Sequence, residues 1–184
     1  MVYLFLAEGF EEIEALAPVD FLRRAGVPVT TVSVGDSLSV RGAHGIEVRA
    51  DVLLSQTDCS DGDMIVLPGG MPGTTHLDEC SSMDEILASA SARGSYLAAI
   101  CAAPMVLGKR GYLNGKSAVC YPGFESDLAG ASISASPVVR DGTVITAKSA
   151  GVAWQFAYRL AEALVGTQVA ERVRTSLFLP EMRD

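Results

Sequence analysis

The stretch YLAAICAAP, Tyr96 to Pro104, decides the fold class of this chain of 184 residues. Its first part is a short apolar run of the kind that forms a buried strand, and the residues directly after Cys101 favour a helix. A strand that passes straight into a helix is typical of alternating α/β folds, in which ligands bind beyond the carboxyl ends of the strands. We therefore predict a sharp elbow at Cys101 that belongs to a functional site.

The rest of the chain continues this alternation. Strands are expected at 2–7, 27–34, 45–51, 63–67, 95–100, 117–120, 134–139 and 143–147, and helices at 8–26, 81–94, 102–111, 151–166 and 167–177. Parallel strands need crossover connections, which are usually helices. The pattern predicts one α/β domain over residues 1–184, a doubly wound, mainly parallel sheet in a three-layer sandwich. Within it, Pro18 predicts a kink or two short helices, and Trp154 is expected in the core.

Composition excludes several classes of protein. The formal net charge is −8, and the one local basic pair, Arg23 and Arg24, is too short for phosphate binding, so nucleic acid and anionic membrane are not expected partners. The sequence shows no apolar run long enough to span a membrane, and its first residues lack the basic flank of a signal peptide. We expect a cytoplasmic protein.

The four cysteines do not resemble a metal site. They are widely spaced with no CxxC pair, and the chain has only 2 histidines, so no metal is expected and the thiols are predicted to be free. Cys59 and Cys80 lie in predicted loops with acidic neighbours. Negative charge raises a thiol pKa, which predicts poor nucleophiles at both positions.

Cys101 differs because of the elbow. The amides at the start of the following helix would favour the thiolate, so a lowered pKa and a reactive thiol are predicted. The alternative interpretation is a small buried hydrophobic residue, the usual role of a free cysteine. The elbow pattern alone does not separate the two.

Two further segments end at the same edge of the predicted sheet. In LPGG, Gly69 and Gly70 permit close backbone approach, and their amides are candidate donors to an oxyanion; an ordinary tight turn is the alternative. In EGFEEIE, Glu11 and Glu12 are expected on a solvated face. Glu14 has apolar neighbours that suggest partial burial, which would raise its pKa and let it share a proton with a thiolate.

The stretches AEGFEEIEALAPVDFLRRAG, VLPGG and AAICAAP, in this order and separation, closely resemble the ThiJ/PfpI superfamily in its DJ-one branch, over nearly the whole chain. The resemblance implies a flavodoxin-like fold, a homodimer and a nucleophilic Cys101. It also implies a protonated Glu14 hydrogen-bonded to the Cys101 sulfur, with Gly70 and Ala102 as backbone oxyanion donors.

At several positions this chain differs from the superfamily pattern, and two of these differences argue against known activities of the superfamily. Peptidase-like members carry a histidine where this chain has Ala102, and amidotransferase relatives need a downstream histidine that is absent here, so both activities are disfavoured. Tyr121 stands where a histidine precedes a proline in the human relative. His44 aligns with an arginine that approaches the partner subunit, although a surface loop histidine is the alternative. Cys120 is either a resolving thiol or a core residue.

Two functional hypotheses remain, and both use Cys101 and Glu14. The first is a stress-protective enzyme without a cofactor, a glutathione-independent glyoxalase acting on small 2-oxoaldehydes such as methylglyoxal, or a deglycase acting on glycated groups. The second is a redox-sensing stress protein or chaperone in which Cys101 oxidises to sulfinate.

Overall fold

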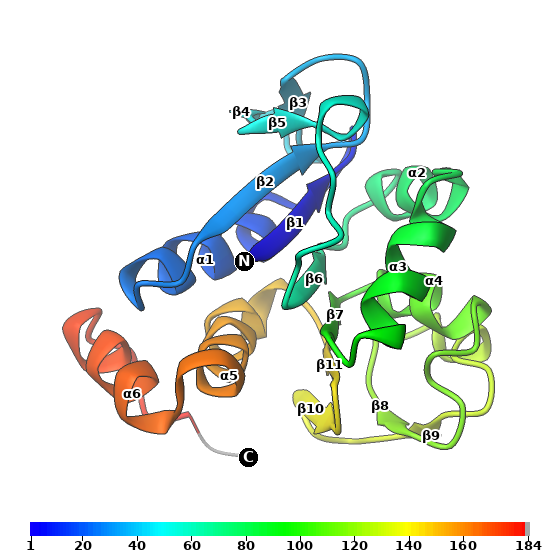
Figure 1. Cartoon of the computed structure of the whole chain (residues 1–184). Coiled ribbons are helices and arrows are strands. Elements are labelled where there is room, and N and C mark those ends of the chain that lie inside the picture. Colours follow the sequence, from blue (N-terminus) through cyan, green and yellow to red (C-terminus); the bar gives the residue numbers. More distant parts are fainter. Residues whose placement is uncertain (183–184) are drawn as a thin grey trace.

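The computed structural model describes residues 1–182 as three layers, with helices on both faces of a central sheet (Figure 1). The sheet has seven strands in the order β10-β11-β7-β6-β1-β2-β5. These strands are β10 (Val138–Asp141), β11 (Val144–Ala147), β7 (Tyr96–Ile100), β6 (Met64–Leu67), β1 (Val2–Leu6), β2 (Val29–Ser33) and β5 (Val52–Leu53). All neighbours pair in parallel except β10 and β11, which form an antiparallel hairpin. The predicted fold class is confirmed.

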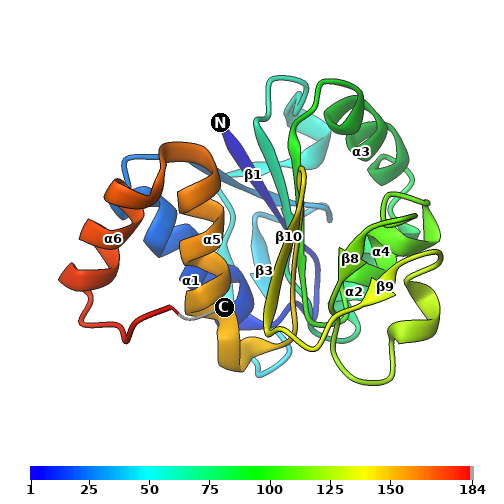
Figure 2. The same cartoon turned by 90° about the horizontal axis from the view of Figure 1, so that it is seen from below.

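Helices divide between the two faces of the sheet (Figure 2). One face carries α1 (Glu12–Arg24), α5 (Ala153–Val165) and α6 (Thr167–Ser176). The other carries α2 (Gly73–Glu79), α3 (Met83–Ala92) and α4 (Pro104–Lys109). Alternate residues of each strand point to opposite faces: Leu4 belongs to the core under α1 and α5, and Phe5 to the core under α2 to α4.

Smaller elements complete the chain. They are β3 (Ser39–Arg41), β4 (Glu47–Arg49), β8 (Ser117–Ala118), β9 (Ser132–Ile133) and the 3₁₀ turns η1 (Leu54–Gln56), η2 (Glu125–Asp127) and η3 (Ala150–Val152). The strand expected at 45–51 is β4, but it pairs with β3 in a separate hairpin, outside the central sheet. Within residues 1–182, no helix combines the length and the apolar character needed to cross a membrane.

Helix α1 corrects one prediction. It is one continuous helix that contains Pro18, so of the two expected alternatives, a kink or two short helices, the second is wrong. Pro18 is buried, and α1 packs along α5 and the sheet over most of its length. That packing compensates for the single backbone hydrogen bond that the proline removes. The helix also has acidic residues in its first turn and Arg23 and Arg24 in its last, which complement the helix dipole.

Two other local expectations were wrong. Trp154 lies on α5 but is 37% exposed, because the buried stripe of that helix passes through Phe156 and Leu160 instead. Helix α2 was not expected, since GTTHLDE has no apolar stripe of helical spacing. It forms because the preceding turn starts it: the amide of Thr74 donates to the carbonyl of Gly70 at 2.8 Å.

Strand register brings the predicted elbow and turns to one edge. Leu67 of β6 aligns with Ala99 of β7, and Ile100 of β7 with Ala147 of β11. The chain moves from β1 to β2 in one direction and returns to β6 on the other side of β1, so the strand order reverses between β1 and β6. Ligands of such sheets bind at this switch point. The segments after β1, β6 and β7 all end there.

Candidate active site

Cys101 lies at the elbow between β7 and α4, and its backbone is strained. Its φ is +65°, in the left-handed region that costs a non-glycine residue about 1–2 kcal/mol. Both of its backbone groups are held. Its N–H donates to the carbonyl of Ala147 at 2.9 Å, and its own carbonyl accepts from the N–H of Tyr121 at 2.8 Å. Strain that is held so firmly is typical of functional sites.

Glu14 lies in the first turn of α1 and is almost fully buried, at 1% exposure. Its Oε2 accepts a hydrogen bond of 3.0 Å from the N–H of Gly69. Its other oxygen, Oε1, is buried with no nitrogen or oxygen partner within residues 1–182. The Cys101 thiol is the side chain that interacts with this carboxyl. Glu14 and Cys101 therefore form a pair.

Glu14 and Cys101 can approach each other closely because Gly69, which lies between them, has no side chain. A β-carbon at this position would lie 2.5 Å from Glu14 Oε2, 2.6 Å from Cys101 Cβ and 3.0 Å from the carbonyl oxygen of Ile100. The φ of Gly69 is not in the left-handed region, so glycine is required here for space and not for conformation. Gly70 differs: its φ is +92°, and a β-carbon there would run into the backbone of Gly9, Phe10 and Glu11.

The two glycines have different hydrogen-bonding roles. The Gly69 amide is committed to Glu14, so it is not available to an oxyanion. The amides of Gly70 and Ala102 instead donate to the Cys101 sulfur. Neither of these two amides has a backbone acceptor within the described residues. Of the predicted donors, Gly70 and Ala102 are the ones directed at the elbow.

The electrostatics of the pair are dominated by burial. Burial raises the pKa of the Glu14 carboxyl to about 7. The interaction with Cys101 lowers this pKa, the charge of Glu11 raises it, and the hydrogen bond from Gly69 lowers it by a smaller amount. Burial also raises the pKa of Cys101, to about 12, together with the charge of an ionised Glu14. A lowered thiol pKa was expected from the helix dipole. Hydrogen bonds from the amides of Ala102 and Gly70 do lower the thiol pKa, but burial and the interaction with Glu14 raise it by more.

The thiol pKa depends on the proton of Glu14. After burial, the largest causes of its rise are the charge of the carboxylate and the hydrogen bond to it. A protonated Glu14 removes the charge and turns its O–H into a donor to sulfur, so the pair must be treated as one titrating unit. The first proton lost from such a unit can come from either group.

Glu11 and Glu12 are not on a solvated face, contrary to expectation. The side chain of Glu11 caps α1 by accepting from the N–H of Glu14 at 2.6 Å. Glu12 is buried, and its carboxyl accepts hydrogen bonds from the backbone amides of His44 and Ile46 and from the His44 ring. Burial opposes its ionisation, but these hydrogen bonds outweigh burial and hold its pKa below the ordinary range. The spacing of Glu11 and Glu14, three residues apart at a helix start, was the available signal for the cap.

His44 is exposed, and its Nδ1 lies 2.7 Å from Glu12 Oε2 and 3.9 Å from Glu11 Oε1. The hydrogen bond to Glu12 raises its pKa. Among the described residues, these three side chains are the only group that brings three potential metal-ligand atoms within 4.8 Å of one another. Glu12 is already saturated by donors of the 44–46 loop, so the cluster is explained as an anchor of that loop on α1.

Cys120 and Tyr121 lie beside the elbow through their backbone. The Cys120 side chain, however, is in the core under α2 to α4, while Cys101 packs against the core under α1 and α5. The two side chains therefore pack against different cores. Burial raises the pKa of Cys120 to about 11, with the charges of Glu125 and Asp127 adding to it. Tyr121 has an exposed side chain.

Fold and site together define a class: a flavodoxin-like α/β protein with a cysteine at a strained elbow, paired with a buried carboxyl at the switch point of the sheet. Comparison with known proteins agrees. The model of the DJ-1/PfpI family matches residues 1–163. The chain therefore belongs to the DJ-1/PfpI family.

Three relatives show how far the similarity extends. "Protein dj-1beta" of Drosophila melanogaster is 35% identical over 178 residues, 96% of this chain and 95% of the relative. "Glutathione-independent glyoxalase DJR-1.2" of Caenorhabditis elegans is 33% identical over 164 residues, 88% of this chain and 86% of the relative. The solved structure "Toxoplasma gondii DJ-1, oxidized" superposes with a TM-score of 0.94 at 34% identity, and the match covers 98% of each chain.

The raised pKa of Glu14 predicts a pH-dependent stability. A carboxyl whose pKa rises from 4.5 to about 7 on folding stabilises the native state fully below pH 4.5, and that contribution is lost as the pH rises through 7. The loss is on the order of 3 kcal/mol in the free energy of unfolding. We expect Glu14→Gln to lack this loss, measured by urea unfolding across this pH range in a Cys101→Ser background that removes the coupled thiol. Glu47→Gln, on the exposed β4, should keep the slope of the parent. Parallel pH profiles for the parent and Glu14→Gln would contradict the assignment.

Proposed function

We propose that the protein is a glutathione-independent glyoxalase that converts small 2-oxoaldehydes such as methylglyoxal to 2-hydroxy acids. The observation that carries the proposal is the burial of Glu14 against Cys101, with a carboxyl pKa near 7. A group of this pKa acts as acid and as base near neutral pH. The family relative named a glutathione-independent glyoxalase supports the same chemistry.

The reaction begins at Cys101. Its thiolate adds to the aldehyde carbon, and the Glu14 proton moves to the resulting alkoxide, which gives a neutral hemithioacetal. The amides of Gly70 and Ala102, which donate to the sulfur in the resting site, are the nearest donors to the developing oxyanion. Because Glu14 gives up its proton when the Cys101 thiolate adds to the aldehyde, it is a carboxylate after this step.

Glu14 then acts as the base. It removes the proton from the former aldehyde carbon, which gives an enediol, and delivers that proton to the neighbouring carbon, while the hydroxyl proton of the first carbon moves to the oxygen of the neighbouring carbon. The first carbon is thereby oxidised to a thioester carbonyl, and the ketone carbon is reduced to an alcohol. The product is a thioester of Cys101, and water hydrolyses it to the hydroxy acid and the free thiol. Electrons balance within the substrate, so no cofactor or glutathione takes part. The deglycase variant of this proposal applies the same addition to glycated groups.

Turnover of methylglyoxal without glutathione tests this proposal. Cys101→Ser and Glu14→Gln should each lower kcat by at least about 100-fold, because serine is a weaker nucleophile and an amide cannot transfer the proton. Cys80→Ser, a thiol change away from the elbow, should match wild type. Turnover retained by Glu14→Gln would exclude Glu14 as the proton shuttle. A folded, reduced wild type without turnover would exclude the glyoxalase function.

A redox-sensing role, including a chaperone-like stress function, is the second candidate, and the different shielding of the cysteines favours it. Cys101 and Cys80 are half-buried, whereas Cys59 and Cys120 are buried, so the access of peroxide differs among the four thiols. Two equivalents of peroxide would convert the Cys101 thiolate to a sulfinate with release of two waters. A protonated Glu14 would donate a hydrogen bond to the product.

Mild peroxide followed by peptide mass spectrometry tests this candidate. Two added oxygens are expected on Cys101, with Cys59 and Cys120 unmodified, and Glu14→Gln should slow the second addition because it lacks the carboxyl proton. Equal oxidation of all four cysteines would contradict a dedicated sensor.

We further propose that the protein is a homodimer through the outer face of α1. Ile13 is 52% exposed and Leu16 follows three residues later, so the two lie on one face of the helix. Ile46, 56% exposed, lies beside them because its amide reaches Glu12 of the same helix. Exposed apolar side chains gathered on one face are typical of interfaces. The same helix carries Glu14, so a second copy would lie near the elbow.

Light scattering after size exclusion tests the dimer. Wild type should have twice the chain mass of 19.3 kDa, and Ile13→Glu combined with Leu16→Glu should have the mass of one chain. Ile133→Glu, an equally exposed apolar position on β9, should remain dimeric. A monomeric wild type would rule out the interface and any contribution of His44 across it.

A further inference from the structure

A second carboxyl group, that of Glu11, lies at the start of α1 beside the Glu14 carboxyl. Its Oε2 accepts a hydrogen bond of 2.6 Å from the backbone N–H of Glu14, so the two side chains belong to the same helical turn. The Glu11 side chain is itself only 14% exposed, and little water separates the pair. A negative charge this close to a buried carboxyl opposes the ionisation of that carboxyl.

The surroundings of the two carboxyls decide which of them keeps a proton. Glu11 accepts from an amide at the N-terminus of α1, where both the hydrogen bond and the helix dipole favour an anion. Glu14 is 1% exposed, and its Oε1 has no nitrogen or oxygen partner within residues 1–182. Two neighbouring carboxyls in such different surroundings take different roles, one as the anion and the other as the acid.

The turn after β6 prevents the two carboxyls from moving apart. The amide of Glu11 donates to the carbonyl of Gly69 at 2.9 Å, and the amide of Gly69 donates to Glu14 Oε2 at 3.0 Å. A β-carbon at Gly70 would lie 2.4 Å from the Glu11 nitrogen, so the turn packs directly on this backbone. The repulsion between the carboxyls is therefore not relieved by a shift of the helix start.

The other charged groups around Glu14 do not replace Glu11. The Glu12 carboxyl is directed to the loop that carries His44, whose amide and ring it binds. His44 Nδ1 lies 3.9 Å from Glu11 Oε1, but that side chain is 68% exposed, and Lys148 before η3 is exposed as well, so solvent screens both cations. The elbow contributes its thiol, and η3 and the turn after β6 contribute backbone amides. Besides burial, the charge of Glu11 raises the pKa of the Glu14 carboxyl.

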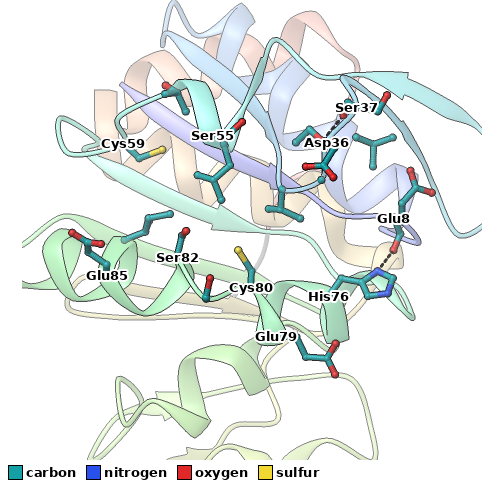
Figure 3. A pocket seen from close by; sticks show the side chains of 18 of the residues that line it. Glu8, Asp36, Ser37, Ser55, Cys59, His76, Glu79, Cys80, Ser82 and Glu85 are labelled. Atoms are coloured by element: carbon teal, nitrogen blue, oxygen red, sulfur yellow. Dashed lines mark hydrogen bonds between the residues drawn. The ribbon is translucent and has the colours of Figure 1, made fainter.

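Glu8, an acidic residue of the same segment, is directed elsewhere. It lines a cavity of about 1080 Å³ between segment 54–60 and helices α2 and α3 (Figure 3). Its Oε1 accepts a hydrogen bond of 3.0 Å from the amide of Arg41. Neither Glu11 nor Cys101 lines this cavity. Glu8 is therefore a comparable carboxylate, three residues before Glu11, that lies outside the site.

We propose that Glu11 is a positioning residue of this site, whose carboxylate keeps the proton on Glu14 at neutral pH and so sets the pH range in which Cys101 reacts. The inference rests on the proposed glyoxalase function where it concerns turnover, and on the resting protein where it concerns the thiol. Without the Glu11 charge, Glu14 and Cys101 each ionise more readily. The form of the pair with one proton, which starts the reaction, then exists at lower pH.

Alkylation of Cys101 by iodoacetamide, followed by peptide mass spectrometry from about pH 5 to about pH 9, tests this without turnover. Glu11→Gln keeps an oxygen that can accept the N–H of Glu14 and removes only the charge. It should move the first inflection of the alkylation rate to lower pH by at least about half a unit. Glu8→Gln, the matched loss of charge in the same segment, should leave the inflection at the wild-type pH.

The pH profile of kcat/KM for methylglyoxal gives the second measurement. Glu11→Gln should move the profile to lower pH by the same amount as the alkylation inflection, whereas a residue needed only as a helix cap would lower the profile without moving it. Glu11→Ala removes the charge and the cap together. It should show the same shift and also a lower melting temperature, which Glu11→Gln should retain at the wild-type value.

Two outcomes would overturn the proposal. One is an alkylation inflection that stays at the wild-type pH in both Glu11→Gln and Glu11→Ala. The other is an equal shift in Glu8→Gln and Glu11→Gln, which would show a general effect of the negative charge of the protein. A shifted inflection in a protein that does not turn over methylglyoxal would reject the glyoxalase function and still support the role of Glu11.

Discussion

Two reciprocal hydrogen bonds between the start of α1 and the turn after β6 are the constraint on which the site depends. The amide of Glu11 donates to the carbonyl of Gly69 at 2.9 Å, and the amide of Gly69 donates to the carboxyl of Glu14 at 3.0 Å. These bonds fix the first helix against the turn at the point where the strand order of the sheet reverses. Cys101 then completes the site from β7, because the missing side chain of Gly69 leaves room for both its Cβ and the Glu14 carboxyl.

Much of this arrangement was predictable from local sequence. The apolar run before Cys101, the LPGG turn and the helix that carries Glu14 each have a pattern of short range, and parallel sheets bring such segments to one edge. What was not predictable depends on contacts between distant residues. The burial of Glu12 is caused by a loop some 30 residues later, and the start of α2 is set by a turn instead of an apolar stripe. The separation of the Cys101 and Cys120 side chains between the two cores depends on how the segments that follow β7 and β8 pack, which no local sequence pattern shows.

The protonation of the site shows how burial competes with backbone dipoles. The helix after Cys101 has only the six residues Pro104–Lys109, and two amides reach the sulfur. These favourable contributions are smaller than the cost of a buried thiolate next to a carboxylate. A carboxyl that keeps its proton near neutral pH changes this balance, because it removes a negative charge and supplies a donor. Glu11 therefore has a role beyond capping, since its charge helps Glu14 to retain that proton.

The two edges of the central sheet differ from its interior. One edge is β5, with two residues, and the other is β10, the single antiparallel strand. Beside β10, the amide of Ser117 on β8 bonds the carboxylate of Asp141, and the Val119 amide bonds the Thr146 hydroxyl of β11. A strand from another molecule could pair at one edge only with the two residues of β5, and at the other edge with β10, next to which β8 is held by side-chain hydrogen bonds. Both edges of the native sheet therefore disfavour fibril growth by sheet extension, even though the central strands β1, β6 and β7 are predominantly apolar.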